Sequence, residues 1–338
     1  MKRIKFAFIV WFFLSSCLFG QDIRNFGWVP QDLNPVSITK SESITTSNNL
    51  DSLPVTGEDA YLWRFLYSSL KKTSQLSQME IESGRLSSLN QGNVGSCVGY
   101  ASTICLDIAM GVSAEIKKSH KEEFIFRCNP DVVYAIGRAD NKGSWDGSRG
   151  IWSVSGLSKL GSLHKKEYEG FSLLSTQPAD GRKWSASGLP GSFLKVAADH
   201  KLISFEKVTS IEQAKKAIQN GYPILTCAQA SYTMKRDSTG FATRTGNKWA
   251  HAMAVVGYRT KGSGQTRGNL EGFLIQNSWG DTWQNGGIYP TDMPRGSFWV
   301  KPEDLLYHLK QADSYAISRY TGFERQILTW EEVFNVHE

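Results

Sequence analysis

The segment Gln91-Gly92-Asn93-Val94-Gly95-Ser96-Cys97 decides the fold, because it places a cysteine directly before a long apolar run from Val98 to Met110. Such a run predicts a buried helix, which Gly111 is expected to close. A cysteine at a helix N-terminus lies beside unsatisfied backbone N–H groups and the positive end of the helix dipole, and both favour the thiolate. We therefore predict that Cys97 is a nucleophile with a lowered thiol pKa.

Two later segments carry the other groups that a thiol nucleophile requires. They are Trp249-Ala250-His251-Ala252 and Gln276-Asn277-Ser278-Trp279-Gly280. An imidazole serves as the base for a thiol, and a carboxamide can hold that imidazole in one orientation. In addition, Gln91 lies six residues before Cys97 and offers a side-chain donor for an oxyanion. Four chemical roles filled in one order are hard to obtain by chance.

The three segments resemble those of the papain-like cysteine peptidases, in which the histidine and the asparagine follow far downstream of the cysteine. The resemblance implies that Cys97 attacks a peptide carbonyl and that His251 is its general base and later the acid. It also implies that Asn277 orients the imidazole and that Gln91 shares the oxyanion hole. Trp279 would then shield the hydrogen bond between the histidine and the asparagine from water.

The resemblance extends over roughly residues 85–305 and implies an α+β fold with two lobes. The N-terminal half is then helical, with a second helix that begins near Asn129-Pro130. The C-terminal half is an antiparallel, barrel-like β-sheet, and the active-site cleft lies between the halves. Buried strands are expected at Pro223–Ala228, Ala252–Tyr258 and Gly272–Gln276, the last two joined by a long hairpin loop.

Three residues are candidate substrate contacts under the same resemblance. Gly150 and Ile151 lie in the segment from Asp146 to Ser153, which is similar to the family segment whose glycines bind extended substrate backbone. An ordinary turn is an equal alternative for Gly150. The third candidate, Ala252, follows the candidate base. No cofactor is implied, and no metal site is predicted, because the chain has no Cys-x-x-Cys and no histidine pair at ligand spacing.

The first 20 residues are predicted to be a secretory signal, because three basic residues precede an apolar run from Phe6 to Leu14 that is too short to stay across a bilayer. Two cleavage sites remain open. Leu14-Ser15-Ser16-Cys17 resembles a bacterial lipobox, which would make Cys17 the lipidated first residue and a membrane anchor. Alternatively, signal peptidase would cut after Gly20, although Leu18 is bulkier than preferred. Both predict export to the periplasm, the cell surface or the extracellular space.

The mature chain carries little net charge. With the signal it loses three of its six net positive charges, and no basic run elsewhere indicates a nucleic-acid partner, so none is predicted. Four cysteines remain. With Cys97 free, at most one disulfide can form among Cys105, Cys128 and Cys227, so stability must come from the hydrophobic core.

Both ends of the mature chain are expected to lie outside the peptidase domain. Residues 21–84 begin as a polar linker, up to about Leu53, and then contain the helical run Tyr61–Leu70. This region is either an inhibitory propeptide or an extension packed on the domain. Residues 306–338 extend past the family core as a tail, which would either dock elsewhere or block one end of the cleft, as in an exopeptidase.

Other functions remain open from the residues alone. A transglutaminase-like enzyme or an amidase would use the same Cys–His pair, but usually has aspartate where this chain has Asn277. A non-catalytic binding protein on the same scaffold would usually have lost Cys97, Gln91 or His251. We therefore predict an exported cysteine peptidase that cleaves protein or peptide substrates, and an endopeptidase unless a loop or terminus blocks the cleft.

Overall fold

The computed structural model of the chain describes residues 27–30, 50–118, 127–262, 270–283, 293–319, 322–323 and 325–326. The predicted signal, with Cys17, lies outside the described residues. Most of the expected hairpin loop, residues 263–269, also lies outside them.

The helices and strands follow one another along the chain with most strands in the second half. The described helices are the 3-10 helix η2 Leu50–Ser52, α1 Leu62–Lys72, α2 Gln78–Ser83, α3 Cys97–Ile116, α4 Pro130–Ile136, α5 Gly150–Leu160, α6 Pro178–Ser187, α7 Gly191–Ala197, α8 Ile211–Gln219 and α9 Pro302–Leu309. The described strands are β1 Ala60–Tyr61, β2 Glu167–Tyr168, β3 Phe171–Ser172, β4 Ser204–Lys207, β5 Ile224–Gln229, β6 Ala250–Arg259, β7 Gly272–Gln276, β8 Ser297–Val300 and β9 Tyr315–Ser318.

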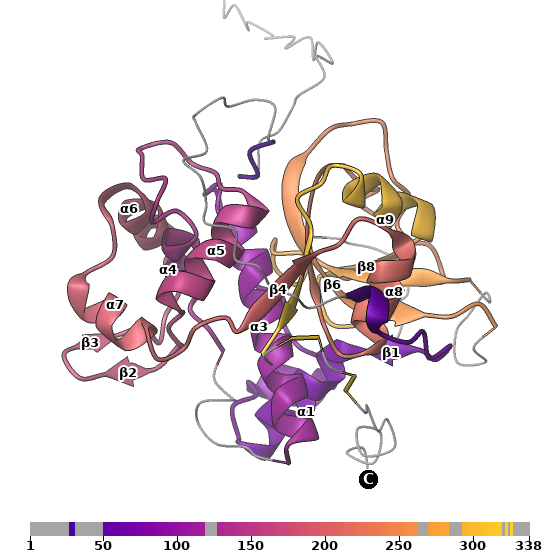
Figure 1. Ribbon diagram of the computed structural model, residues 1–338, viewed down its shortest axis with the longest axis horizontal. Helices are drawn as coiled ribbons and strands as arrows, with labels where there is room; N and C mark the ends of the chain where they lie inside the picture. Colours follow the sequence, from indigo (N-terminus) through magenta and orange to yellow (C-terminus); the bar gives the residue numbers. More distant parts are fainter. Residues whose placement is uncertain are drawn as a thin grey trace, which may run out of the picture.

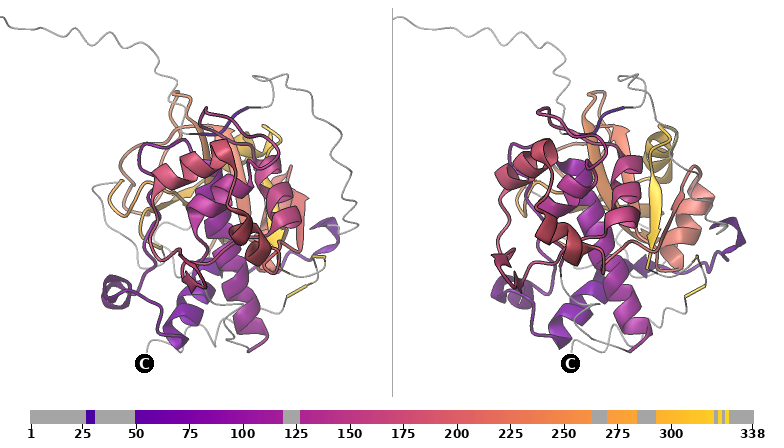
Figure 2. Two further views of the ribbon diagram at one scale, coloured as in Figure 1. Left: turned by 90° about the vertical axis from the view of Figure 1, so that its left-hand side faces the viewer. Right: turned by 60° about the vertical axis from the view of Figure 1, so that its left-hand side comes forward.

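These elements form two lobes (Figure 1). Helices α4 to α7 and the small β2–β3 hairpin gather on one side, the main sheet lies on the other, and α3 lies between them. The right-hand view of Figure 2 keeps this division. The main sheet has the order β4-β9-β5-β6-β7-β8, with β1 paired to β6, and every neighbouring pair in it is antiparallel. The predicted α+β fold, helical first and antiparallel β second, is confirmed.

Helix α3 is the central element. Every residue from Cys97 to Ala114 is buried, and although the helix is long and apolar enough to span a membrane, it lies wholly inside the protein. The helix runs on to Ile116, so the expectation that Gly111 closes it is wrong. A Cβ atom at Gly111 would lie 2.5 Å from the Cα atom of Leu66, which shows that this glycine allows α1 to pack closely on α3.

A second glycine serves the other side of α3 in the same way. A Cβ atom at Gly99 would lie 2.5 Å from the Cα atom of Tyr134 in α4. Helix α4 begins where the sequence predicts, because the Asn129 side chain accepts the backbone N–H groups of Asp131 and Val132. Two close helix contacts therefore hold α3, and with it the residue at its N-terminus, in one position.

The described part of the N-terminal region, from Leu50 onward, packs on the domain. Strand β1 pairs with β6, and α1 packs along α3. Leu50 and Leu53 are buried, so the linker expected up to Leu53 ends earlier, because these two side chains are part of the core. For these residues the arrangement is that of a packed extension.

The last described segments correct the expected tail. Residues 306–338 were expected to extend past the core, but α9 and β9 belong to the fold. Strand β9 lies inside the main sheet, between β4 and β5, and all four of its residues are buried. The fold therefore includes Ser318, and Phe323 beyond it is also buried and contacts Tyr222.

The described cysteines are part of the hydrophobic core as buried thiols. Cys97, Cys105, Cys128 and Cys227, which are all the cysteines in the described part of the chain, are free and buried. None of the disulfides that the sequence allows among them forms.

Glycine-to-alanine substitution should have different effects at two helical positions. In Gly111→Ala the new methyl group meets the backbone of Leu66, so we expect the free energy of unfolding to fall by about 1–3 kcal/mol. Gly191→Ala in α7 is the matched control, because no atom lies within 4 Å of the added Cβ and alanine has the higher helix propensity. Urea unfolding compares the two variants. A Gly111→Ala protein as stable as the control would contradict the close packing of α1 on α3.

Candidate active site

Cys97 is the first residue of α3 and is completely buried where this helix meets β6. Backbone N–H groups near its sulfur, among them those of Val98, Ala252 and Trp28, favour the thiolate. Ala252 follows His251 in β6. The thiol therefore lies beside the strand that carries the candidate base.

His251 and Asn277 form the second part of the site. The His251 Nε2 atom lies 2.7 Å from Asn277 Oδ1, and the backbone N–H of Ser278 donates to the same oxygen over 2.8 Å. Because the N–H of Ser278 requires an acceptor, the Asn277 side chain is fixed with its oxygen toward the imidazole. His251 Nε2 therefore carries the proton, and Nδ1 is the basic nitrogen of the neutral ring.

Burial controls the charge of both groups. It raises the pKa of the Cys97 thiol to about 12, although the N–H of Ala252 opposes this. Burial also lowers the pKa of His251 to about 4, against the hydrogen bond that His251 donates to Asn277, which raises it. Both groups are therefore neutral at pH 7. The expectation of a lowered Cys97 pKa is wrong for this structure, because desolvation outweighs the N–H groups at the helix N-terminus.

Trp279 covers the imidazole. Its ring stacks on that of His251 with centroids 4.6 Å apart and planes 29° from parallel. Trp249 and Trp283 flank Trp279 at centroid distances of 5.2 Å and 5.1 Å. Trp249 was not singled out from the sequence, although it lies within the motif that identified His251. The three indoles form an apolar cover beside the hydrogen bond to Asn277.

Gln91 is buried, and both the oxygen and the nitrogen of its side-chain amide are hydrogen-bonded. Its Oε1 atom accepts the hydroxyl of Ser278 over 2.8 Å, and its Nε2 atom donates to the carbonyl of Val94 over 2.9 Å. The backbone N–H of Gln91 also donates to the carbonyl of Ser278. These bonds fix the loop before Cys97 to the segment that carries Asn277.

Residues Gly27 to Pro30 cross this site. Trp28 forms a parallel bridge with Ser148: the N–H of Val29 donates to the Ser148 carbonyl over 2.9 Å, and the N–H of Ser148 donates to the Gly27 carbonyl over 2.6 Å. The N–H of Trp28 faces the carbonyl of Ala250 at 3.4 Å. Gly27 has φ +115°, and any side chain there would run into the backbone carbonyl of Gly95. The segment therefore lies between the loop before Cys97 and the start of β6.

The Trp28 side chain enters the protein beside the sulfur and is 2% exposed. Its indole Nε1 donates to Asp313 Oδ2 over 2.8 Å. The same carboxylate accepts the N–H of Gly150 over 2.7 Å and that of Ile151 over 2.9 Å. Gly150 is thus the first residue of α5 and not part of a turn. All three candidate substrate contacts lie beside groups that Trp28 also approaches. Gly150 and Ile151 share the Asp313 carboxylate with the Trp28 indole, and the N–H groups of Ala252 and Trp28 both lie near the Cys97 sulfur.

Neither Trp28 nor Asp313 was identified from the sequence. Trp28 lies in a polar stretch that was interpreted as a linker, and Asp313 lies in the segment that was interpreted as a tail. The one available signal was the unusual tryptophan within the polar stretch.

The site joins a cysteine at a helix N-terminus to a histidine–asparagine pair on the facing sheet. The chain matches the family model described as papain family cysteine protease over residues 82–296, which is more than half of its length. The chain belongs to this family.

Two similar proteins illustrate the family relationship. The probable cysteine protease RD19B of Arabidopsis thaliana is 24% identical over 207 residues, which are 59% of this chain and 53% of that protein. This chain therefore spans about half the length of that curated relative. Among solved structures, Xylellain, a cysteine protease from Xylella fastidiosa, superposes with a TM-score of 0.54 at 16% identity, over 90% of this chain and 99% of that one. The superposition on Xylellain supports the papain-like fold.

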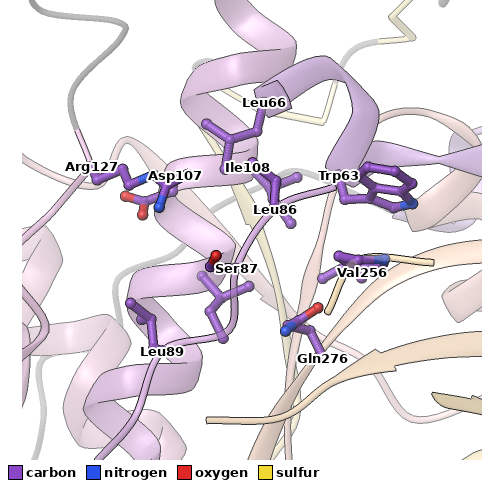
Figure 3. A pocket seen from close by; sticks show the side chains of 12 residues that line it. Trp63, Leu66, Leu86, Ser87, Leu89, Asp107, Ile108, Arg127, Val256 and Gln276 are labelled. Carbon is purple, nitrogen blue, oxygen red and sulfur yellow. The ribbon is translucent and has the colours of Figure 1, made fainter. Parts of the chain in front are cut away.

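A separate small cavity lies between α1, α3 and the sheet (Figure 3). Apolar side chains such as Trp63 and Val256 line most of it, and Gln276, the residue before Asn277, reaches it. Burial raises the pKa of Asp107, at the other end, to about 7. Cys97, His251 and Asn277 are not among its lining residues, so the cavity is separate from the candidate active site. Within the described residues no three His, Cys, Asp or Glu side chains are grouped to hold a metal ion.

The lowered pKa of His251 should appear as a pH dependence of stability. The folded pKa of about 4 lies below the ordinary value of 6.5, so the unfolded chain binds the extra proton. This contribution is complete above about pH 6.5 and is lost as the pH falls toward 4, at about 1.4 kcal/mol per pH unit. His251→Gln keeps an N–H donor for Asn277 but has no group that titrates in this range. We therefore expect its free energy of unfolding to change less with pH, by this slope. Urea unfolding between pH 4.5 and 6.5 measures it, and equal slopes in both proteins would contradict it.

Proposed function

We propose that this papain-family protein is a peptidase in which Cys97 is the nucleophile, His251 the general base and acid, and Asn277 the residue that orients His251. The observation that carries the proposal is the 2.7 Å hydrogen bond from His251 to Asn277, on a strand whose next residue, Ala252, has its N–H near the Cys97 sulfur. The imidazole is thereby fixed in one tautomer next to the thiol.

The reaction follows from this arrangement. His251 Nδ1 takes the thiol proton, and the Cys97 thiolate adds to the substrate carbonyl carbon. The imidazolium then gives this proton to the leaving amine, and a thioester remains on Cys97. Water, deprotonated by His251, adds to the thioester; the C–S bond then breaks, and the leaving Cys97 thiolate takes the proton from the imidazolium as the acid product is released. Asn277 Oδ1 keeps the same ring orientation throughout.

Gln91 supplies a donor for the oxyanion in this proposal, together with the backbone N–H of Cys97. The Gln91 Nε2 group, which donates to the Val94 carbonyl, is the side-chain donor assigned to the oxyanion. The bond from Ser278 fixes the amide, so no reorganisation is needed when charge develops.

Gln91→Glu tests this role with little change of shape. The variant keeps an oxygen for Ser278 and loses the amide donor, so we expect kcat to fall by about 10²–10³ with little change in KM. Steady-state kinetics on a peptide substrate measures the effect. A kcat within about threefold of the unsubstituted enzyme would exclude Gln91 from the oxyanion hole.

The segment from Gly27 to Pro30 is proposed to keep the enzyme latent. It occupies the space next to the sulfur, presents an N–H of Trp28 to Cys97 and bridges to Ser148. A substrate cannot reach the sulfur while this segment is in place, and the burial that raises the pKa of Cys97 keeps the thiol protonated. This assigns the inhibitory role to residues upstream of α1, whereas α1 itself is part of the fold.

Displacement of the segment should therefore activate the thiol. Gly27→Val places a side chain against the carbonyl of Gly95, so the segment cannot stay bound. We expect labelling of Cys97 by an epoxysuccinyl thiol-protease inhibitor, followed by intact mass at pH 7, to accelerate about tenfold or more, since each unit of pKa lost raises the thiolate fraction tenfold. Gly57→Val is the matched control: its φ is also positive, at +75°, but no atom lies within 4 Å of the added Cβ.

The outcomes separate the two parts of the proposal. Cys97→Ala must abolish the adduct in every background, which assigns the label to this thiol. Equal labelling of Gly27→Val and the unsubstituted protein would contradict latency. No adduct and no peptide hydrolysis in any variant would contradict Cys97 as the nucleophile.

Export and domain limits complete the proposal. The predicted signal supports export, either as a soluble protein or with Cys17 as a lipid anchor. The peptidase domain is proposed to extend from about residue 85 to Ser318, since β9 is part of the sheet. The residues before it form the packed extension and the inhibitory segment.

A further inference from the structure

The pocket that receives Trp28 is built around a buried carboxylate. Asp313 is fully buried, and its two oxygens accept the first N–H groups of the eleven-residue helix α5, from Gly150 and Ile151. A helix N-terminus stabilises a negative charge at this place. Asp313 forms no ion pair with any lysine, arginine or histidine of the described chain. Its charge is therefore balanced by N–H groups and not by a cation.

The indole of Trp28 supplies the third N–H group to this carboxylate, over 2.8 Å. Unlike Gly150 and Ile151, Trp28 belongs to a segment that has to leave before catalysis. Once Trp28 has left, Asp313 Oδ2 has lost one hydrogen-bond donor, and a new occupant of the pocket can supply another. The other groups near Asp313 are uncharged. They are the Tyr315 hydroxyl, which also interacts with the carboxylate, and Cys227, which is fully buried in β5 and pairs with Ala252 in β6. An occupant must therefore be largely apolar and must carry one donor.

We propose that Asp313 determines substrate specificity, and that the pocket selects a tryptophan in the substrate residue that takes the place of Trp28 beside Ser148. This inference rests on the proposed function of Cys97. A residue without a donor, such as phenylalanine, leaves the carboxylate with one partner fewer in a buried place, which is costly. A lysine or arginine fills the donor position, but has to lose its water in a pocket where the charge of Asp313 is already balanced.

The test compares two side chains of the same shape. Peptides carry either tryptophan or 3-benzothienylalanine, in which sulfur replaces the indole N–H, at each position near the scissile bond in turn. The enzyme carries Gly27→Val, so that Trp28 does not compete. At one position we expect kcat/KM to be about 10–100-fold higher for tryptophan, as for other buried hydrogen bonds to a charged group. Mass spectrometry of the products identifies that position.

A variant assigns the selectivity to the carboxylate. In Asp313→Ala the ratio of the two kcat/KM values should fall to about one, because kcat/KM for the tryptophan peptide drops while that for the analogue changes little. Asp140→Ala removes the same charge from an exposed site, where the side chain is 70% accessible, and should keep the ratio. A purely structural role of Asp313 would lower both values together and leave the ratio unchanged.

Three results would overturn the inference. They are a ratio within about twofold at every position in the Gly27→Val enzyme, a stronger preference for arginine or lysine than for tryptophan, and an unchanged ratio in Asp313→Ala. The first two need no substitution at Asp313, so they hold even if that variant does not fold. Absence of both hydrolysis and Cys97 labelling would instead remove the proposed function and this inference with it.

Discussion

The close packing of α3 is the constraint on which the rest of the structure depends. Gly99 and Gly111 allow α4 and α1 to approach its backbone, and the helix is buried along almost its whole length. It cannot rotate or slide without disturbing both lobes. Cys97, as its first residue, is therefore fixed by the core of the protein and not by a loop. His251 lies on β6, which packs against the same helix. The candidate site thus has rigid elements on both sides, which is the arrangement that accurate positioning of reacting groups requires.

That same burial opposes the chemistry that the site is proposed to perform. A helix N-terminus stabilises an adjacent anion by about 0.3–1 kcal/mol, or about 2 kcal/mol in favourable buried geometry. Burial acts in the opposite direction and raises the Cys97 pKa from 9.0 to about 12, which corresponds to about 4 kcal/mol. The second effect is larger, so the occluded thiol is neutral. Access of water or substrate to the sulfur, and not a further change in the helix, is therefore what can restore its reactivity.

Local sequence signals predicted the elements that carry the motifs. The start of α3, the cap of α4 at Asn129, and strands β6 and β7 all follow from short patterns, because the interactions that form them lie within a few residues. Three other features depend on distant partners. Gly111 was interpreted as a helix end, whereas the backbone of Leu66 explains it. Strand β9 has only four residues, and its position is set by pairing with β4 and β5.

The contact between Trp28 and Asp313 is the most distant of these features, since it joins residues 285 positions apart. Each residue alone lies in a stretch whose composition is typical of a linker or a tail. Nothing in either stretch indicates the other, so their pairing could not be predicted from one sequence. The candidate site was therefore predictable in its reacting groups, and unpredictable in the groups that surround them.

The direction of the chain explains how one pocket can accept both an inhibitory segment and a substrate. The Trp28 bridge to Ser148 is parallel, and the N–H of Trp28 lies near the Cys97 sulfur. We infer that the bound segment presents this donor to the candidate nucleophile in place of a carbonyl carbon. A substrate that enters in the opposite direction can place the same side chain against Asp313 and turn a carbonyl toward the sulfur. In this arrangement the carboxylate selects the side chain, whereas the direction of the backbone decides whether the bound chain is cut.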